Sequence, residues 1–142
     1  MTVQAQWLNS DEFKKSLELA PRSVLELVIT NAGGGLLLVT REGEPYVGNW
    51  HLPGGFVMKN ETFSQCAKRV GNKELGVSDL EIVKKLDFFD DPNADPRGHI
   101  HHLVVACQTN QIKVGGKIKF FNKLPKNLIP YQRLFLQQLG FK

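Results

Sequence analysis

With 142 residues, of which 42% are hydrophobic and 23% charged, the chain has the size and composition of one soluble globular domain, and we expect a single domain over residues 1–142. No apolar run approaches the roughly 20 residues that span a bilayer, and the segment Met1–Gln6 lacks the basic and apolar parts of a secretory signal. We therefore expect a cytoplasmic protein with no membrane partner. Two cysteines, Cys66 and Cys107, lie in apolar segments, a placement that favours buried free thiols over a disulfide framework.

The charge is unevenly distributed along the chain, whose net charge is +4. All 14 acidic residues lie at or before Asp95, and the basic residues that follow it are Arg97, Lys113, Lys117, Lys119, Lys123, Lys126, Arg133 and Lys142. Such a basic surface is either a solvated lysine-rich rim or a region that attracts phosphorylated ligands or nucleic acid. Charge alone does not decide between these alternatives.

The first predicted elements are a helix and a hairpin. Ser10 is a typical N-cap for a short helix that ends before Pro21. Branched apolar residues at 23–31 predict a strand. The glycines at 33–35 then turn the chain, so that 36–40 is expected to return as its hairpin partner.

The middle of the chain predicts a short extended piece at 50–52, stopped by Pro53 and two glycines, and then a helix over 62–75. Apolar residues recur in that helix at three- and four-residue spacing, and Gly76 supplies a C-terminal cap.

The remaining pattern indicates further strands and one more helix. The strands are expected at 80–89, 101–109 and 111–121, with a polar loop at 90–99, and a closing helix over 128–139 directs Leu134, Phe135 and Leu139 inward. Strands mixed with a few helices favour an α+β fold in which a sheet is sandwiched between helices.

The segment from Gly55 to Val77 carries the clearest chemical pattern. A glycine turn lets a backbone carbonyl approach a metal ion without a side chain in the way, and helix residues at i, i+3 and i+4 share one face. Six positions match the Nudix box in register: Gly55, Glu61, Arg69, Glu74, Gly76 and Val77. The chain therefore resembles the Nudix hydrolases.

This resemblance implies a Nudix fold, with a mixed β-sheet between helices, and a cleft that holds Mg²⁺, or Mn²⁺, beside a nucleoside diphosphate derivative. By the same resemblance the metal ligands are the Gly55 carbonyl and Glu74, and an ion pair of Glu61 with Arg69 braces the loop against the helix. Glu74, Glu61 and Arg69 are accordingly catalytic candidates. The residues alone leave open an ordinary surface ion pair and a solvated helix carboxylate.

The box is eroded at two of its three helix glutamates, which are replaced by Val70 and Lys73. At about 6 Å and an effective dielectric near 20, a lysine and a divalent ion repel by up to roughly 5 kcal/mol, less if the side chain swings into water. We therefore expect one metal ion rather than a cluster, held by Glu74, the Gly55 carbonyl and the substrate's phosphates.

Over most of its length the chain is similar to the GDP-mannose mannosyl hydrolase branch, which also keeps only the last box glutamate. The similarity lies in the segments 19–21, 25–29, 37–41, 48–50, 88–91 and 102–105. It implies a nucleotide-sugar substrate such as GDP-mannose and a homodimer. It also implies that Arg41 contacts the diphosphate or nucleotide and that His102 lines the sugar side; Asp90 and Lys73 are further substrate-binding candidates.

Two departures from that branch concern its chemistry. Phe56 stands where an arginine usually follows the box glycine, and Val114 and Gly115 stand where a glutamine–histidine pair supplies a metal ligand and a general base. The base must then come from elsewhere, and the candidates are His99, His101, His102, Asp90, Asp91 and Asp95. Neighbouring strand residues face opposite sides, so at most one of His101 and His102 reaches the site. A separate metal site of Asp91, Asp95 and His99 competes with the simpler interpretation of a solvated loop.

Three hypotheses follow. The first is a Mg²⁺-dependent hydrolase of a nucleoside diphosphate linked to a sugar or similar group. The second is a catalytically impaired Nudix domain that binds such a compound without turnover. The third, RNA-directed pyrophosphohydrolysis, rests on the basic C-terminal third and is weakened by the lost glutamates, so we expect no nucleic-acid partner.

Overall fold

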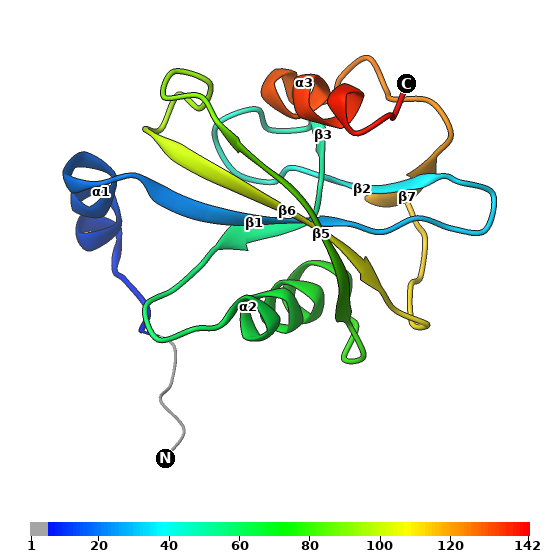
Figure 1. Ribbon diagram of the computed structural model, residues 1–142, viewed down its shortest axis with the longest axis horizontal. Helices are drawn as coiled ribbons and strands as arrows, with labels where there is room; N and C mark the ends of the chain where they lie inside the picture. The colour runs from blue at the N-terminus through cyan, green and yellow to red at the C-terminus, as the bar shows by residue number, and fades with distance from the viewer. Residues whose placement is uncertain (1–5) are drawn as a thin grey trace.

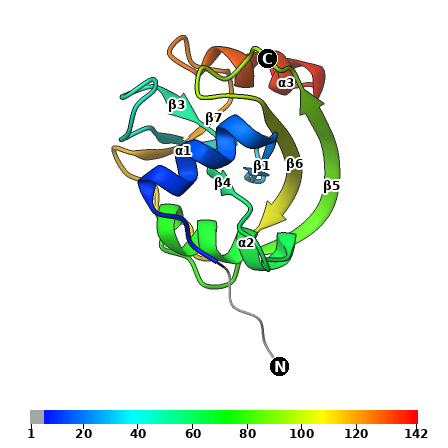
Figure 2. The ribbon, with the colours of Figure 1, turned by 90° about the vertical axis from the view of Figure 1, so that its left-hand side faces the viewer.

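The computed structural model describes residues 6–142, so most of the segment in which we looked for a secretory signal lies outside the described residues. The strands form a layer between helix α2 (Phe63–Val70) on one side and helix α3 (Pro130–Gln138) on the other (Figure 1). Helix α1 (Ser10–Leu19) crosses one end of this layer (Figure 2). This confirms the predicted α+β fold with a sheet between helices. No helix within residues 6–142 combines the length and the apolar character needed to cross a membrane.

The strands belong to two sheets. The first has the order β4-β1-β6-β5, and its strands run over Gly54–Phe56, Arg22–Val28, Ile100–Gln108 and Glu81–Asp90. In it β1 and β6 are parallel and the other pairs are antiparallel. The second sheet is antiparallel, with the order β3-β2-β7, and covers Trp50–His51, Leu36–Thr40 and Ile118–Phe121.

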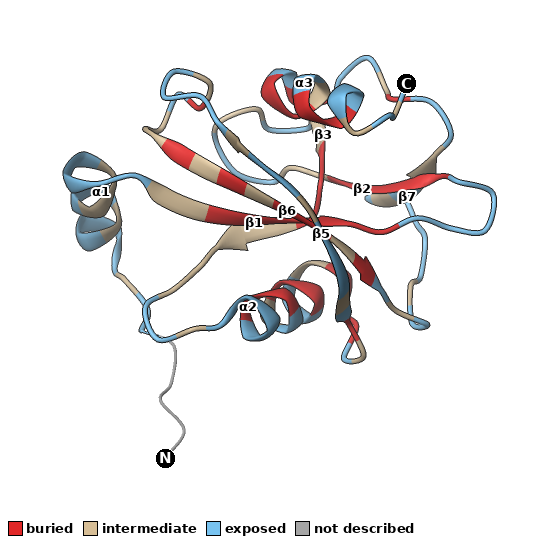
Figure 3. Ribbon diagram, in the orientation of Figure 1, coloured by how far each residue is buried: buried red, intermediate tan, exposed pale blue. Residues whose placement is uncertain are grey.

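Buried residues lie in β1, β2, β6, α2 and α3 (Figure 3), and most of them are apolar and form a core on each face of the strand layer. Alternate residues of β1 face opposite sides: Leu25 packs in the core under α2, whereas Val28 packs with Phe135 under α3. Cys66 and Cys107 belong to the α2 core. Both are free and buried, as predicted, and burial raises the pKa of each thiol to about 12.

The predicted hairpin between residues 23–31 and 36–40 is wrong in its pairing. Only the bridge between Thr30 and Leu36 joins the two segments; beyond it the chain crosses to the other sheet, where β2 pairs with β3 and β7. The reason is that Leu36–Val39 is buried on both faces of its strand, so its uniform apolar pattern carries no information about its neighbours.

Three smaller predictions also need correction. Asn9, not Ser10, caps α1, because its side chain accepts a hydrogen bond from the Glu12 backbone amide. The last strand begins at Ile118 rather than at residue 111. Leu134 is 63% exposed, because α3 turns Tyr131, Gln132, Phe135 and Leu136 inward.

Candidate functional site

The helix of the eroded box is held at both ends by local sequence. Thr62 caps α2 and forms a capping box with Gln65, and Gly76 ends the element in the left-handed region at φ 66°. Its last turn, η1 (Gly71–Leu75), is a π-turn with i→i+5 hydrogen bonding. This wider turn alters the phase of Glu74 relative to the preceding α-helical face, which the sequence pattern did not predict.

The expected ion pair between Glu61 and Arg69 is present. Arg69 Nε lies 2.6 Å from Glu61 Oε2, and Arg69 Nη2 donates both to Glu61 Oε1 at 2.9 Å and to the Phe56 carbonyl at 2.8 Å. The Glu61 carboxylate, whose side chain is 3% exposed, also accepts from the Met58 amide. Burial is the largest single effect and would raise the pKa of Glu61, but the hydrogen bonds from Arg69 and the Met58 amide, together with the positive charge of Arg69, lower that pKa. The pair is a buried brace between the loop and the helix.

The two eroded positions have different surroundings. Val70 is 2% exposed in the α2 core, and a Cβ added to Gly55 would lie 3.0 Å from its Cγ2 atom. The position of the first helix glutamate has thus become part of the packing beneath the glycine turn. Lys73 is exposed to solvent and lines the mouth of the cleft.

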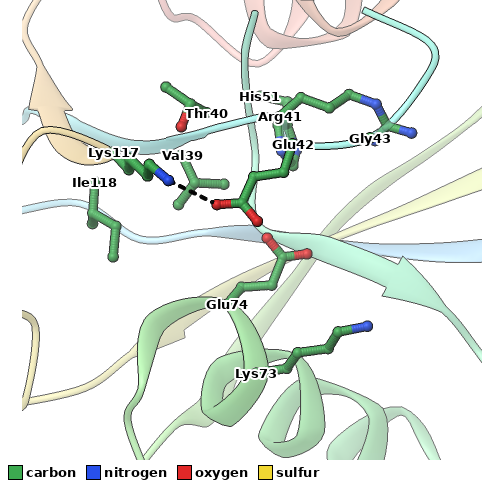
Figure 4. A pocket seen from close by; sticks show the side chains of 10 residues that line it. All are labelled: Val39, Thr40, Arg41, Glu42, Gly43, His51, Lys73, Glu74, Lys117 and Ile118. Atoms are coloured by element: carbon green, nitrogen blue, oxygen red, sulfur yellow. Dashed lines mark hydrogen bonds and ion pairs between the residues drawn. The ribbon is translucent and has the colours of Figure 1, made fainter. Parts of the chain in front are cut away.

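Two adjoining cavities of about 420 and 120 Å³ form the cleft, and Arg41, His51 and Glu74 line both of them. Figure 4 shows the Glu74 carboxylate rising from the end of the helix toward that of Glu42, which forms an ion pair with Lys117. The structure therefore brings the sequence-predicted Arg41, Lys73 and Glu74 to one cleft. Gly55 lines the smaller cavity.

A second buried carboxylate, Glu26 of β1, faces this cleft and was missed from the sequence. It is 3% exposed and lines the smaller cavity with Glu74. A Cβ added to Gly54 would lie 2.6 Å from Glu26 Oε2, so only glycine leaves room for this carboxylate at the turn. Burial, and next the negative charge of Glu26, raise the pKa of Glu74 to about 7, against opposing effects of Lys73, the Gly54 amide and Arg41.

Side chains of β6 and α3 hold Glu26 in place from behind. His102 Nδ1 lies 3.1 Å from Glu26 Oε1, and Gln132 Nε2 lies 3.5 Å from Glu26 Oε2. The Gln132 amide is itself oriented by the Leu52 backbone amide, which donates to its oxygen at 2.7 Å. His102 is 4% exposed, and its Nε2 atom is buried without a partner. The predicted catalytic His102 therefore reaches the cleft only through Glu26.

The only histidine that lines the cleft among the described residues is His51, which we did not include among the candidate bases. The residue is 8% exposed, and its Nδ1 lies 2.7 Å from the Leu52 carbonyl oxygen, which only accepts hydrogen bonds. Nδ1 therefore carries the proton, and Nε2 is the acceptor in the neutral ring. Burial is the largest effect on this ring and lowers its pKa.

Cationic side chains surround the acidic centre of the cleft. The Arg41 guanidinium donates to the carbonyl oxygens of Glu44 and Pro45, which fixes the loop beside it. Arg97 lines the smaller cavity and pairs with buried Asp95 at 2.7 Å. Together with Lys73, these residues make the rim suitable for a phosphorylated ligand.

Asp90, a predicted substrate-binding residue, does not line this cleft. It lies at the end of β5, which β6 separates from β1 and β4, and its carboxylate contacts His99 and His101. Asp90 and His102 instead border a third cavity, of about 200 Å³, beneath α3. The alternative site of Asp91, Asp95 and His99 is not formed either, because Asp95 is paired with Arg97.

Comparisons with known proteins agree with this architecture. A family model described as NUDIX domain matches residues 19–121. The chain is 32% identical over 140 residues to the low-salt glycan biosynthesis protein Agl8 of Haloferax volcanii, which covers 91% of this chain and 88% of that protein. It is 30% identical over 114 residues to ADP-ribose pyrophosphatase of Methanocaldococcus jannaschii, and this match covers 75% of this chain and 67% of that protein. The crystal structure of a MutT NUDIX hydrolase from Burkholderia pseudomallei matches with a TM-score of 0.69 at 25% identity, over 84% of this chain and 98% of that chain.

A helix that ends in a carboxylate, set against a glycine turn in a cleft with a cationic rim, is the arrangement expected of an α+β domain that binds phosphorylated compounds. Within that class the chain belongs to the Nudix family of hydrolases, which act on nucleoside diphosphate derivatives with the help of a divalent metal ion. Neither curated relative is described as a GDP-mannose hydrolase.

Proposed function

We propose that this chain hydrolyses nucleoside diphosphate sugars with one divalent ion, and that GDP-mannose and ADP-ribose are the first compounds to test. The observation that carries the proposal is the pair of carboxylates, Glu74 and Glu26, at one glycine turn. Glu26 supplies from β1 an oxygen donor that the eroded helix no longer supplies.

The residues fit a hard divalent cation such as Mg²⁺ or Mn²⁺. Burial first and the negative charge of Glu26 second raise the pKa of Glu74, and a cation between the two carboxylates would offset both effects. Glu74 and Glu26 are the proposed ligands, with the Gly55 carbonyl as a third. When bound, such an ion polarises the phosphate oxygens and neutralises their charge.

The remaining residues of the cleft orient the substrate. Arg41, Arg97 and Lys73 carry positive charges at its rim and are proposed to hold the diphosphate, while Glu61 and Arg69 keep the loop fixed against the helix. His102 and Gln132 act as positioning residues, because both contact Glu26 rather than the cavity.

We assign the general base to His51. With Nδ1 donating to the Leu52 carbonyl and a lowered pKa, the ring stays neutral near pH 7 and offers Nε2 as a proton acceptor for water. Substitution of His51 by Gln should lower kcat by roughly a hundredfold, with a smaller change in KM. A loss confined to KM would remove His51 from this role.

The names of the two relatives support the substrate class. One is an ADP-ribose pyrophosphatase, and ADP-ribose is itself a nucleoside diphosphate linked to a sugar. The other is named for glycan biosynthesis, a process that draws on activated sugars. GDP-mannose rests on the narrower resemblance described above. The homodimer and the cytoplasmic location stay predictions.

The test is a panel of GDP-mannose, other nucleotide sugars, ADP-ribose, dinucleotides and capped RNA, incubated with Mg²⁺ or Mn²⁺ and followed by chromatography. We expect turnover of a nucleotide sugar that falls by roughly a hundredfold or more in Glu74→Gln and in Glu26→Gln. Glu81→Gln, which removes an exposed carboxylate from β5, is the matched control. Labelled water then shows whether oxygen enters the sugar or the phosphate.

A second candidate function is binding without turnover, which the packing of Val70 into the core and the charge of Lys73 favour. If no compound is hydrolysed but one binds with micromolar affinity, and Glu74→Gln leaves that affinity unchanged, the hydrolase proposal is wrong and the binding domain replaces it. Turnover of capped RNA alone would instead support the third hypothesis.

A further inference from the structure

Three metal-ligating side chains converge outside the cleft, at the open end of the β5–β6 pair. The antiparallel register sets Asp90 opposite His101, and His99, two residues earlier, projects to the same side. His99 Nε2 lies 2.5 Å and His101 Nε2 3.6 Å from the same oxygen, Asp90 Oδ1. One ligand atom from each residue lies within 4.8 Å of the other two.

This cluster is separate from the proposed hydrolytic site. None of its members lines either cavity beside Glu74, and β6 lies between β5 and the strand that carries Glu26. The side chains are 33%, 40% and 53% exposed for His99, His101 and Asp90, so an ion and its waters can reach them from solvent. Within residues 6–142 it is the one group of three such side chains that converges in this way.

We propose that Asp90, His99 and His101 form a binding site for a zinc-class divalent ion, that is Zn²⁺, Co²⁺ or Ni²⁺, with solvent water completing its coordination. Two imidazoles and one carboxylate are the donor set that borderline ions prefer, whereas Mg²⁺ prefers oxygen ligands alone. The cluster and the cleft therefore select different ions.

The geometry needs little rearrangement to accept an ion. Zinc binds nitrogen and carboxylate oxygen at about 2.0–2.2 Å, which separates neighbouring ligand atoms by roughly 3.3 Å in a tetrahedral site. The two present separations, 2.5 and 3.6 Å, bracket that value.

An ion at this position would close a loop that reaches the cleft. Asp90 and His99 flank residues 91–98, and this loop carries Arg97, which lines the smaller cavity with Glu26 and Glu74. Because the ion would bind the folded chain in preference to the unfolded one, it should raise the thermal midpoint. The site thus ties the position of Arg97 to the presence of a second, chemically different metal.

The experiment titrates untagged, chelator-treated protein with Zn²⁺ by calorimetry and with Co²⁺ by visible absorption. We expect one ion per chain with micromolar affinity, and a cobalt spectrum of nitrogen and oxygen ligation. His99→Ala and His101→Ala should each weaken zinc binding by roughly tenfold or more. The control is Asp87→Asn, an exposed substitution on β5, the strand that carries Asp90, and it should leave zinc binding unchanged. These positions are exposed enough that the variants should fold, which far-ultraviolet circular dichroism verifies.

Two results would overturn the site: no zinc binding in the micromolar range, or binding that survives both alanine substitutions. The outcome is independent of the proposed hydrolysis. Glu74→Gln should retain zinc binding, millimolar Mg²⁺ should not displace the ion, and a protein inactive toward every nucleotide should still bind zinc at the cluster.

Discussion

Glu61 and Glu74 lie at the two ends of one loop–helix unit, and their surroundings are opposite. Glu61 is paired with Arg69 and its pKa is lowered, whereas burial, and next the negative charge of Glu26, raise the pKa of Glu74 to about 7. The first carboxylate stabilises the fold as it is. The second is destabilised when it ionises, which is the usual condition of a group that meets its partner only when a ligand arrives.

The difference also explains which box positions have been lost. Glu61 and Arg69, the part of the box that braces the loop, are both retained, because the loss of either would leave a buried charge unpaired. The half that gathers metal ligands has lost two of three carboxylates, and Glu26 lies where it can replace one of them. Structure and ligand binding therefore place separate demands on the same motif.

The largest effect is expected from Val70→Glu, which restores the family's residue at a position that is now core. The new carboxylate would lie against Gly55 among apolar side chains and should destabilise the protein by about 4 kcal/mol. Urea unfolding measures the change. A variant as stable as the parent would mean that the new carboxylate can turn out of the core into the cleft, so that position 70 can again carry a glutamate.

Glu61→Gln should cost about 3 kcal/mol, because Arg69 then keeps a buried charge without its carboxylate. The same unfolding experiment applies. Glu42→Gln, which breaks the exposed ion pair with Lys117, serves as the control and should cost under about 1 kcal/mol. Equal losses in the two variants would contradict the contrast between a buried brace and a surface pair.

Glu74→Gln should act in the opposite direction and stabilise the metal-free protein by on the order of 2 kcal/mol at pH 8. A carboxyl whose folded pKa is raised holds its proton more tightly in the native state, so the parent loses stability as pH rises from about 4.5 to about 7. The variant, which cannot ionise, escapes this loss. Thermal unfolding in a chelator at pH 4 and pH 8 is the measurement.

At pH 4 the two proteins should have the same midpoint, and saturating Mg²⁺ at pH 8 should remove the advantage of the variant by stabilising the parent. If Glu74→Gln is no more stable than the parent at pH 8, the ionised Glu74 carboxylate does not destabilise the fold, and the contrast with Glu61 fails.

The sequence predicted those parts of the molecule that depend on local chemistry. Thr62 and Gly76 mark the ends of the box helix, and the in-register glycine, glutamate and arginine positions placed the loop beside it. Arg41, Lys73 and Glu74 were expected near one ligand and do line one cleft. The α+β fold followed from the same local patterns.

What could not be predicted depends on contacts between distant segments. Glu26 is fixed by His102 and Gln132, which lie 76 and 106 residues away, and its only trace in the sequence is a single acid inside an apolar strand. Asp90 and His102 border a different cavity from Glu74, because the order of strands, which one sequence does not give, decides which side of β6 faces the cleft. His51 beside the glycine turn was recognisable and was overlooked.

The smallest effect belongs to Lys73→Glu, which restores the second lost carboxylate at an exposed position. Removing one positive charge and adding one negative charge at the mouth of the cleft should tighten Mn²⁺ binding by roughly fivefold, about 1 kcal/mol, because solvent screens most of the interaction. Calorimetry in low salt, with a non-hydrolysable nucleoside diphosphate present, measures the affinity. Lys68→Glu makes the same change of net charge on α2 at an exposed position that lines neither cavity, so it separates a local effect from a general one. Equal tightening by both variants would show that Lys73 acts only through the net charge. Tighter Mn²⁺ binding in Lys73→Glu but not in Lys68→Glu, together with a loss of stability in Val70→Glu, would have one meaning. A metal-binding glutamate could then be restored at the exposed position 73 but not at position 70, which has become part of the core.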